Sequence, residues 1–181
     1  INSVGTAYGG DSSFTTASSA VAPTVTTTTA SSITASSVST GGNVTSDGGS
    51  TVTVRGIVYG TTSNPVLGTD IDSAYGSGGT GSYTIAINGL TAGTTYHVRA
   101  YAINSIDTSY GSDVSFTTLA APTVTTTAAS SITNTTASSG GNVTSDGGAS
   151  ITERGIVYST SANPTTADTK VVDGAATTGT F

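Results

Sequence analysis

Apolar and polar residues alternate along one stretch of the chain, Thr94–Thr118. Every second residue is apolar at Tyr96, Val98, Ala100 and Ala102, and apolar positions of the same parity return at Tyr110, Val114 and Phe116. A period of two places successive side chains on opposite faces of an extended strand, with one face buried. The stretch therefore predicts two consecutive β-strands.

Shorter stretches of the same kind precede this pair of strands. Gly, Asn-Pro and Asp-Gly steps separate them, and no stretch has the period of about 3.6 residues that marks a helix. The strands are expected at Thr24–Thr29, Ile33–Thr45, Val52–Tyr59, Tyr83–Ile87, Tyr96–Ile103 and Tyr110–Thr118, with a short edge strand near Asp70–Ala74. This order predicts an all-β antiparallel sandwich.

The chain also contains an internal repeat of about 100 residues. The sequence GGNVTSDGG occupies Gly41–Gly49 and returns 99 positions later at Gly140–Gly148. Each copy is preceded by APTVTTT and followed by RGIVY and then by an Asn-Pro step. A repeat of this length matches one immunoglobulin-like sandwich and is much longer than a solenoid repeat. We therefore expect tandem sandwiches.

The repeat divides the chain into three parts. Residues 20–119 are expected to form one complete sandwich, and residues 120–181 the first strands of a following repeat. Residues 1–19 are expected to be the last strand of a preceding repeat, because Tyr8 and Phe14 align with Tyr110 and Phe116.

Partial sandwiches leave strand edges open, and two explanations compete. The chain is a window on a longer covalent array, or partial units complete one another between subunits by strand addition. Joining the tail of one chain to the head of the next still lacks the counterparts of Thr84–Ala102. Simple head-to-tail exchange therefore does not close a sandwich, and the sequence favours the longer array.

Composition narrows the function classes. Charged residues make up 8% of the chain, against about a quarter in ordinary domains. The net charge of −6 argues against a nucleic-acid partner, and no apolar run is long enough to insert into a membrane. The absence of Cys excludes a disulfide framework and a thiolate metal site. A Ser/Thr-rich acidic chain favours an extracellular or cell-surface location.

The segment LTAGTTYHVRAYAINS, followed by YGSDVSFTT, resembles the last two strands of a fibronectin type III domain. Leu90 and Tyr96 match the tyrosine-corner region of that family. The whole repeat is similar to the tandem fibronectin type III/immunoglobulin-like repeats of large secreted or surface proteins of Bacteroidetes bacteria. Val58-Tyr59 stands where those repeats usually carry Cys-Trp.

The resemblance implies a structural module of an extracellular bacterial stalk, fibre or filament that serves adhesion. Its expected partners are neighbouring copies or repeats of the same protein, and glycans or host and cell surfaces. It implies no catalytic residues and no cofactor, so an enzyme is not expected. The alternative is a glycan- or protein-binding accessory module of a secreted polysaccharide-degrading enzyme.

Few residues suggest chemistry. His97 is the only His, and we expect it to be an exposed strand residue without an acidic partner. The loop residues Asp47, Asp70, Asp72 and Asp146 are expected to stabilise turns. A structural Ca²⁺ ion at a repeat junction is the alternative for Asp11, Asp113 or these loop acids. Arg55 and Arg154 recur at one repeat position, which favours pairing with an acid or cover of apolar surface.

Three residues remain as candidate surface sites. Tyr75 and Tyr101 are predicted to be outward aromatic residues that could contact a ligand, Tyr75 from a long Gly-rich connection. Asp72-Ser73-Ala74 resembles the O-glycosylation acceptor pattern of Bacteroidetes secreted proteins, which makes Ser73 a candidate glycosylation site.

Overall fold

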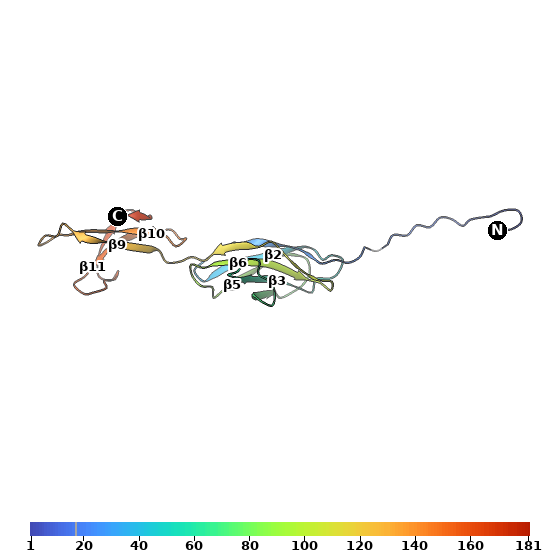
Figure 1. The fold of residues 1–181 in the computed structure, drawn as a ribbon, viewed down its shortest axis with the longest axis horizontal. Helices are drawn as coiled ribbons and strands as arrows, with labels where there is room; N and C mark the ends of the chain where they lie inside the picture. Colours follow the sequence, from blue (N-terminus) through green and yellow to red (C-terminus); the bar gives the residue numbers. More distant parts are fainter. Residues whose placement is uncertain (17) are drawn as a thin grey trace.

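The computed structural model describes residues 1–16 and 18–181, and the regular elements among these residues are all β-strands. Figure 1 shows an extended N-terminal segment followed by two β-units, which we call the first unit (residues 20–119) and the second unit (residues 120–181). None of the described residues forms a helix long and apolar enough to cross a membrane.

The first unit has the predicted strands. They are β1 (Thr24–Ser31), β2 (Ser37–Ser46), β3 (Val54–Gly60), β4 (Ile71–Tyr75), β5 (Gly81–Asn88), β6 (Thr95–Ile103), β7 (Thr108–Tyr110) and β8 (Val114–Thr117). The expected last strand is divided into β7 and β8 by residues 111–113, where Gly111 lies against Thr27 of β1. The short edge strand predicted near Asp70–Ala74 is present as β4.

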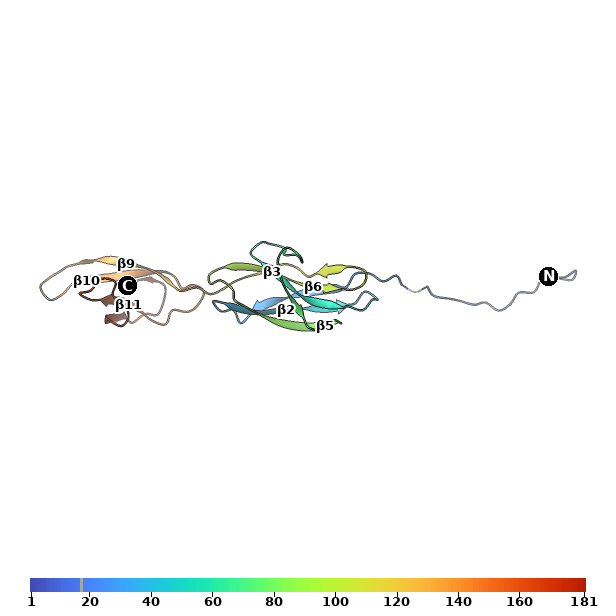
Figure 2. The same cartoon turned by 90° about the horizontal axis from the view of Figure 1, so that it is seen from below.

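These strands form two facing antiparallel sheets. One sheet has the order β1-β2-β5, and the other has the order β4-β3-β6-β7, with β8 also paired to β6. The two layers lie one above the other in Figure 2. The prediction of an all-β antiparallel sandwich is confirmed.

The core between the sheets is made mainly of small and medium side chains. Its fully or nearly fully buried members include Val38, Val44, Val52, Ile57, Val98, Ala100 and Ala102. The sheets approach each other closely at Gly42, where a Cβ atom would lie 2.5 Å from the Ala100 Cβ and 2.7 Å from the Tyr83 Oη. Any larger residue at position 42 would separate the layers.

Polar side chains also connect the two sheets. The Thr27 hydroxyl of β1 donates a hydrogen bond to the Ser112 carbonyl at 2.6 Å and accepts one from the Ala100 N–H of β6 at 3.0 Å. The Tyr83 hydroxyl of β5 donates to the Gly56 carbonyl of β3 at 2.7 Å. Such bonds satisfy polar groups that burial would otherwise leave unpaired.

The β5–β6 connection ends in a tyrosine corner. Tyr96 lies at the start of β6, and its hydroxyl accepts a hydrogen bond from the Thr91 N–H at 3.1 Å. Leu90, just before that turn, is 8% exposed and belongs to the core. The sequence predicts this corner from the same two residues, Leu90 and Tyr96.

The recurring Arg occupies an inward position at the rim of each unit. Arg55 is 7% exposed, and its guanidinium lies 5.0 Å from the Tyr75 ring centroid and 5.1 Å from that of Tyr83. It donates to the carbonyls of Thr80 and Gly81, both at 2.9 Å, and so closes the loop before β5. Cation–π contacts of this kind stabilise a desolvated cation.

Arg154 repeats this arrangement with one exchange of partner. It lies 5.2 Å from the Phe181 ring centroid, and its guanidinium bonds the Asp173 carboxylate at 2.7 Å. Asp173 stands opposite Arg154 in the ladder, where Tyr75 stands opposite Arg55. Of the two predicted roles, pairing with an acid holds for Arg154. Arg55 instead packs against the rings of Tyr75 and Tyr83.

The second unit repeats part of the first. Its strands are β9 (Thr123–Ser130), β10 (Ser138–Ser145), β11 (Arg154–Tyr158), β12 (Thr169–Asp173) and β13 (Gly179–Thr180). They form the sheets β13-β10-β9 and β11-β12. The β9–β10 register, with Val124 opposite Val143, copies the β1–β2 register, with Val25 opposite Val44.

The N-terminal segment Ile1–Thr16 contains no strand, and Tyr8 and Phe14 are 90% and 88% exposed. It nevertheless contains a turn that matches the turn after β6 in the first unit. The Asn2 side chain accepts from the N–H groups of Val4 and Gly5, as Asn104 does from Ile106 and Asp107. The described residues offer this segment no sheet to join, and Ala17, within the predicted 1–19 range, lies outside the described residues.

Burial of the tyrosines makes the first unit sensitive to alkaline pH. Burial raises the pKa of Tyr83 from 10.0 to about 12, and desolvation also raises the pKa of Tyr59 and Tyr101. Because the folded pKa lies above the unfolded one, this stabilisation is complete below pH 10 and is lost as pH rises through about 12.

We expect Tyr83→Phe to lower the free energy of unfolding of the first unit by about 1 kcal/mol at pH 7, through loss of the bond to Gly56. The variant should also lose less stability than the parent between pH 9 and about 12, because one ionisation is removed. Urea unfolding monitored by circular dichroism at several pH values measures both effects. An unchanged pH profile would contradict the assignment of Tyr83.

Candidate functional site at the joint between the units

The joint between the two units is the segment Thr118–Ala120, and every residue in it is hydrogen-bonded to one unit or the other. The Thr118 N–H donates to the Thr94 carbonyl at 3.0 Å, and the Leu119 N–H donates to the Thr34 carbonyl at 3.0 Å. The next N–H, that of Ala120, donates to the Gly147 carbonyl of the second unit at 2.8 Å. The joint therefore has no free linker residue.

Gly147 belongs to the turn after β10, and only a residue without a side chain fits there. Its φ is +70°, and a Cβ atom would lie 2.1 Å from the Ala120 carbonyl oxygen. The neighbouring Gly148 faces the Leu119 side chain of the joint, with 3.2 Å between its Cβ position and the Leu119 Cδ2. The Gly-Gly pair thus forms a socket for the end of the preceding unit.

The same socket exists at the start of the first unit. The Val21 N–H donates to the Gly48 carbonyl at 2.8 Å, and Gly48 has a φ of +70°. The Asn104 amide fixes this contact by donating to the carbonyls of Val21 and Asp47, both at 2.8 Å. The sequence alone predicts that SDGG is a turn. In the structure, this turn of each unit also accepts a hydrogen bond from the segment that precedes the unit's first strand.

Tyr101 points outward from β6, as predicted, but it is buried, which does not favour its predicted contact with a ligand. Its side chain leaves the outer face of β6 but lies across Gly56 of β3, and only 2% of it is exposed. Asp72 and Tyr110 lie close enough to raise its pKa further. Because Gly56 has no side chain, the ring settles onto the sheet, where a ligand has no access to it.

Tyr75 is half-buried and is the last residue of β4, the short strand within the long connection in which the sequence places it. Its ring lies over Arg55 and 5.3 Å from the Tyr83 ring centroid. These contacts give Tyr75 a packing role at the rim of the sandwich. Its contact with a ligand stays a prediction.

Ser73 lies in the middle of β4, opposite Ile57 of β3, and is half-buried. Ile57 points into the core, so Ser73 is on the inner side of this edge strand. The candidate O-glycosylation at Ser73 stays a prediction, which this position does not favour.

His97 differs from its sequence-based expectation. Its Nδ1 lies 2.8 Å from the Asp113 carboxylate, and its side chain is 24% exposed. The same carboxylate oxygen accepts from the Asn64 N–H at 3.2 Å, and the loop that carries Asn64 is further held by a bond from the Leu67 N–H to the Tyr110 hydroxyl. His97 and Asp113 thus anchor the Asn-Pro loop over the sheet.

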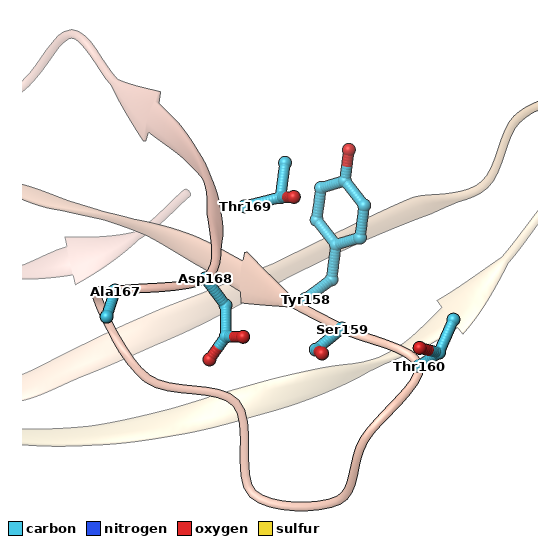
Figure 3. Close-up of a pocket in the computed structure, with 6 residues that line it drawn as sticks. All are labelled: Tyr158, Ser159, Thr160, Ala167, Asp168 and Thr169. Carbon is cyan, nitrogen blue, oxygen red and sulfur yellow. The ribbon is translucent and has the colours of Figure 1, made fainter.

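Neither a metal site nor a ligand pocket with convergent polar groups emerges from the described residues. They contain no group of three or more His, Asp or Glu that could hold a metal ion. An open hollow of about 640 Å³ lies beside the second unit's loop, lined by Tyr158, Asp168 and their neighbours. In Figure 3 the Tyr158 ring and the Asp168 carboxylate point away from each other.

The Asp168 carboxylate already has a structural task in this loop. It accepts from the Thr165 N–H at 2.8 Å, and this bond lowers the pKa of Asp168. In the first unit, the Asp70 carboxylate accepts a hydrogen bond from the Val66 N–H at 3.0 Å. The prediction that loop acids stabilise turns is confirmed for Asp70, and for Asp47 and Asp146, which accept from the N–H groups of Gly49 and Gly148 at 2.9 Å. Asp72 lies in β4 and not in a turn.

Comparisons with known proteins identify no family for this chain. No protein-family model matches the chain, and no curated protein matches it. Among solved structures it is similar to the sensor domain of the anti-sigma factor RsgI4 of Pseudobacteroides cellulosolvens, with 22% identity and a TM-score of 0.44. The match covers 57% of this chain and 100% of that one.

We expect Gly147→Ala to loosen the joint while both units stay folded. The new Cβ collides with the Ala120 carbonyl, and the left-handed backbone costs a non-Gly residue about 1–3 kcal/mol. Spin labels on Ala86→Cys and Ala162→Cys, in a chain without other Cys, report the inter-unit distance. The distance distribution should broaden.

Gly174→Ala is the matched control for this experiment. No atom lies within 4 Å of its Cβ position, and its φ is not positive, so the distance distribution should not change. Equal distributions in the parent and in Gly147→Ala would show that the socket does not hold the joint.

Proposed function

We propose that the chain is part of a tandem array of fibronectin type III-like sandwiches that forms an extracellular bacterial stalk, fibre or filament serving adhesion. The observation that carries the proposal is the joint, in which consecutive residues bond to the two units with no free residue between them. Short held joints make an array stiff, and a stiff array projects a terminal binding site away from a cell.

Repetition of the socket supports the tandem arrangement. Gly48 and Gly147 hold Val21 and Ala120 by the same bond at the same distance, 2.8 Å. The β9–β10 ladder also repeats the β1–β2 ladder residue by residue. Because the same hydrogen bond holds the start of each unit, further units could be joined to the array in the same way.

The strand order supports a fibronectin type III-like fold. Three strands face a sheet built around β3 and β6, and a tyrosine corner precedes β6. The ends of the first unit lie at opposite ends of the sandwich (Figure 1), as a stalk module requires.

A mechanical role also agrees with the outer surface of the sheet β1-β2-β5. None of these three strands contains a charged residue, and their exposed side chains are mostly Ser, Thr and Asn. Such a surface is hydrated without attracting nucleic acid or anionic lipid. Its partners would be neighbouring repeats or copies of the protein, with glycans or cell surfaces bound elsewhere along the fibre.

The proposal is tested on intact cells of the organism that makes the protein. Antibodies raised against residues 20–119 should label thin surface fibres in electron micrographs, and deletion of the gene should remove the fibres and reduce attachment to a surface. Label confined to the cytoplasm, or fibres and attachment unchanged after deletion, would refute the proposal. The native polypeptide mass under denaturing conditions separates a covalent array from a polymer of subunits.

A further inference from the structure

The chain contains one Asn-Gly step, Asn88-Gly89, and it lies where β5 ends. Asn88 is exposed and stands opposite Ser37 at the last pair of the β2–β5 ladder. Gly89 follows with a φ of +77°, a conformation that Gly adopts without the strain of a side chain. Leu90 then returns to the core, and its N–H donates to the Ser36 carbonyl at 3.0 Å.

An Asn-Gly step can react with itself, because Gly has no side chain to obstruct the approach of its backbone nitrogen. The Gly89 nitrogen loses its proton and bonds to the Asn88 Cγ, and the side-chain amide leaves as ammonia. The resulting five-membered succinimide then takes up one water molecule. Opening at one carbonyl gives aspartate, and opening at the other gives isoaspartate, in which the main chain runs through the side chain.

The fold leaves both reacting groups of this step free. Among the described residues, no hydrogen bond involves the Gly89 N–H or the Asn88 side chain. The second edge of β5 is unpaired, and no atom lies within 4 Å of the Gly89 Cβ position. The Asn88–Gly89 peptide can therefore rotate into the reactive geometry without breaking a hydrogen bond of either reacting group.

The three Asp-Gly steps of the chain are held by hydrogen bonds instead. In Asp47-Gly48, the Gly48 N–H donates to the Ser46 hydroxyl at 3.1 Å, and the Asp47 carboxylate accepts from the Gly49 N–H at 2.9 Å. The socket turn of the second unit repeats both bonds at the same distances. In the third step, the carboxylate accepts from the Arg154 guanidinium at 2.7 Å. The Asn-Gly step lacks every bond of this kind.

We propose that Asn88-Gly89 is a site of spontaneous covalent modification, which converts Asn88 to aspartate or isoaspartate in the folded protein. The change puts a carboxylate on the sheet β1-β2-β5, whose strands contain no charged residue. Isoaspartate also adds one main-chain atom directly before Leu90 and the tyrosine corner, and so displaces both relative to the ladder. This inference goes beyond the proposed function, because it requires neither a fibre nor a stiff joint.

Mass spectrometry of the whole 181-residue chain, incubated at mildly alkaline pH, tests the site. Replacement of the amide by a hydroxyl group adds about 1 Da. Trypsin cleaves after Arg55 and Arg99, so the gain should appear in the fragment of residues 56–99. The Asn64-Pro65 step in the same fragment is an internal control, because Pro has no N–H to lose. Enzymatic methylation of isoaspartate distinguishes the two products.

Asp47→Asn is the matched variant, because it places a second Asn-Gly step where both groups are bonded. Its side-chain oxygen can accept from the Gly49 N–H, and the Gly48 N–H keeps the Ser46 hydroxyl. For each step, the rate in the folded chain is divided by the rate in urea, so that differences between flanking residues cancel. Folding should slow the step at position 47 at least about tenfold more than Asn88-Gly89, because two hydrogen bonds must open first.

The two products separate the added charge from the added main-chain atom. Asn88→Asp carries the same charge with a normal main chain, so amide exchange at Leu90 and Thr91 should match that of the parent. The isoaspartate form, purified from the incubated chain, should exchange these amides at least about tenfold faster. Asn88→Gln cannot close the five-membered ring, so its fragment should not gain mass over the same period.

Three outcomes would overturn the proposal. Absence of the mass gain in the folded chain, while the chain in urea reacts completely, would show that the fold protects Asn88. Equal slowing of the two Asn-Gly steps would show that free groups do not decide the reactivity. Unchanged exchange at Leu90 and Thr91 in the isoaspartate form would contradict the effect on the corner. None of these results bears on the joint, so the proposed function and this site fail separately.

Discussion

The close approach of β2 to β6 at Gly42 is the contact on which the first unit depends. The Cβ position of Gly42 lies 2.5 Å from the Ala100 Cβ, so the two sheets are separated by the smallest side chains available. A chain with few large apolar residues cannot fill a wide core, but it can fill a thin one. Tyr83 then spans the gap and bonds the Gly56 carbonyl across it, which couples the layers through a polar contact as well as through packing.

Much of this fold could be predicted from the alternation of residues, because strands of period two and turns of Gly, Asn and Asp are local features. Tyr96 and Leu90 also indicated the tyrosine corner correctly. The burial of Tyr101 could not be predicted in this way. Alternation places Tyr101 outward, and it does point outward, but its burial depends on Gly56 of a neighbouring strand. The same holds for His97, whose partner Asp113 lies beyond the next turn.

The joint was harder to predict, because its signal is a turn sequence with two uses. The sequence SDGG is sufficient to end one strand and begin the next. Nothing in it indicates that the turn also binds the backbone of the preceding segment. The second use follows from the positive φ of Gly147 combined with the 2.1 Å between its Cβ position and the Ala120 carbonyl oxygen. Both the positive φ and the short distance allow only Gly at position 147. Because Gly has no side chain, another backbone can approach the turn, and the backbone of Ala120 lies there.

The two copies of RGIVY separate what local sequence determines from what neighbours determine. Both copies form a strand, both pair with the strand that follows, and both place Arg against an aromatic ring and the carbonyls of the next loop. They differ in what β6 supplies. Ile57 is fully buried, whereas Ile156 is half-buried. The first copy pairs with strands on both sides, and the second copy pairs with β12 alone among the described residues. The strand is therefore a property of the sequence, while the completed sandwich is a property of the segment that arrives beside it.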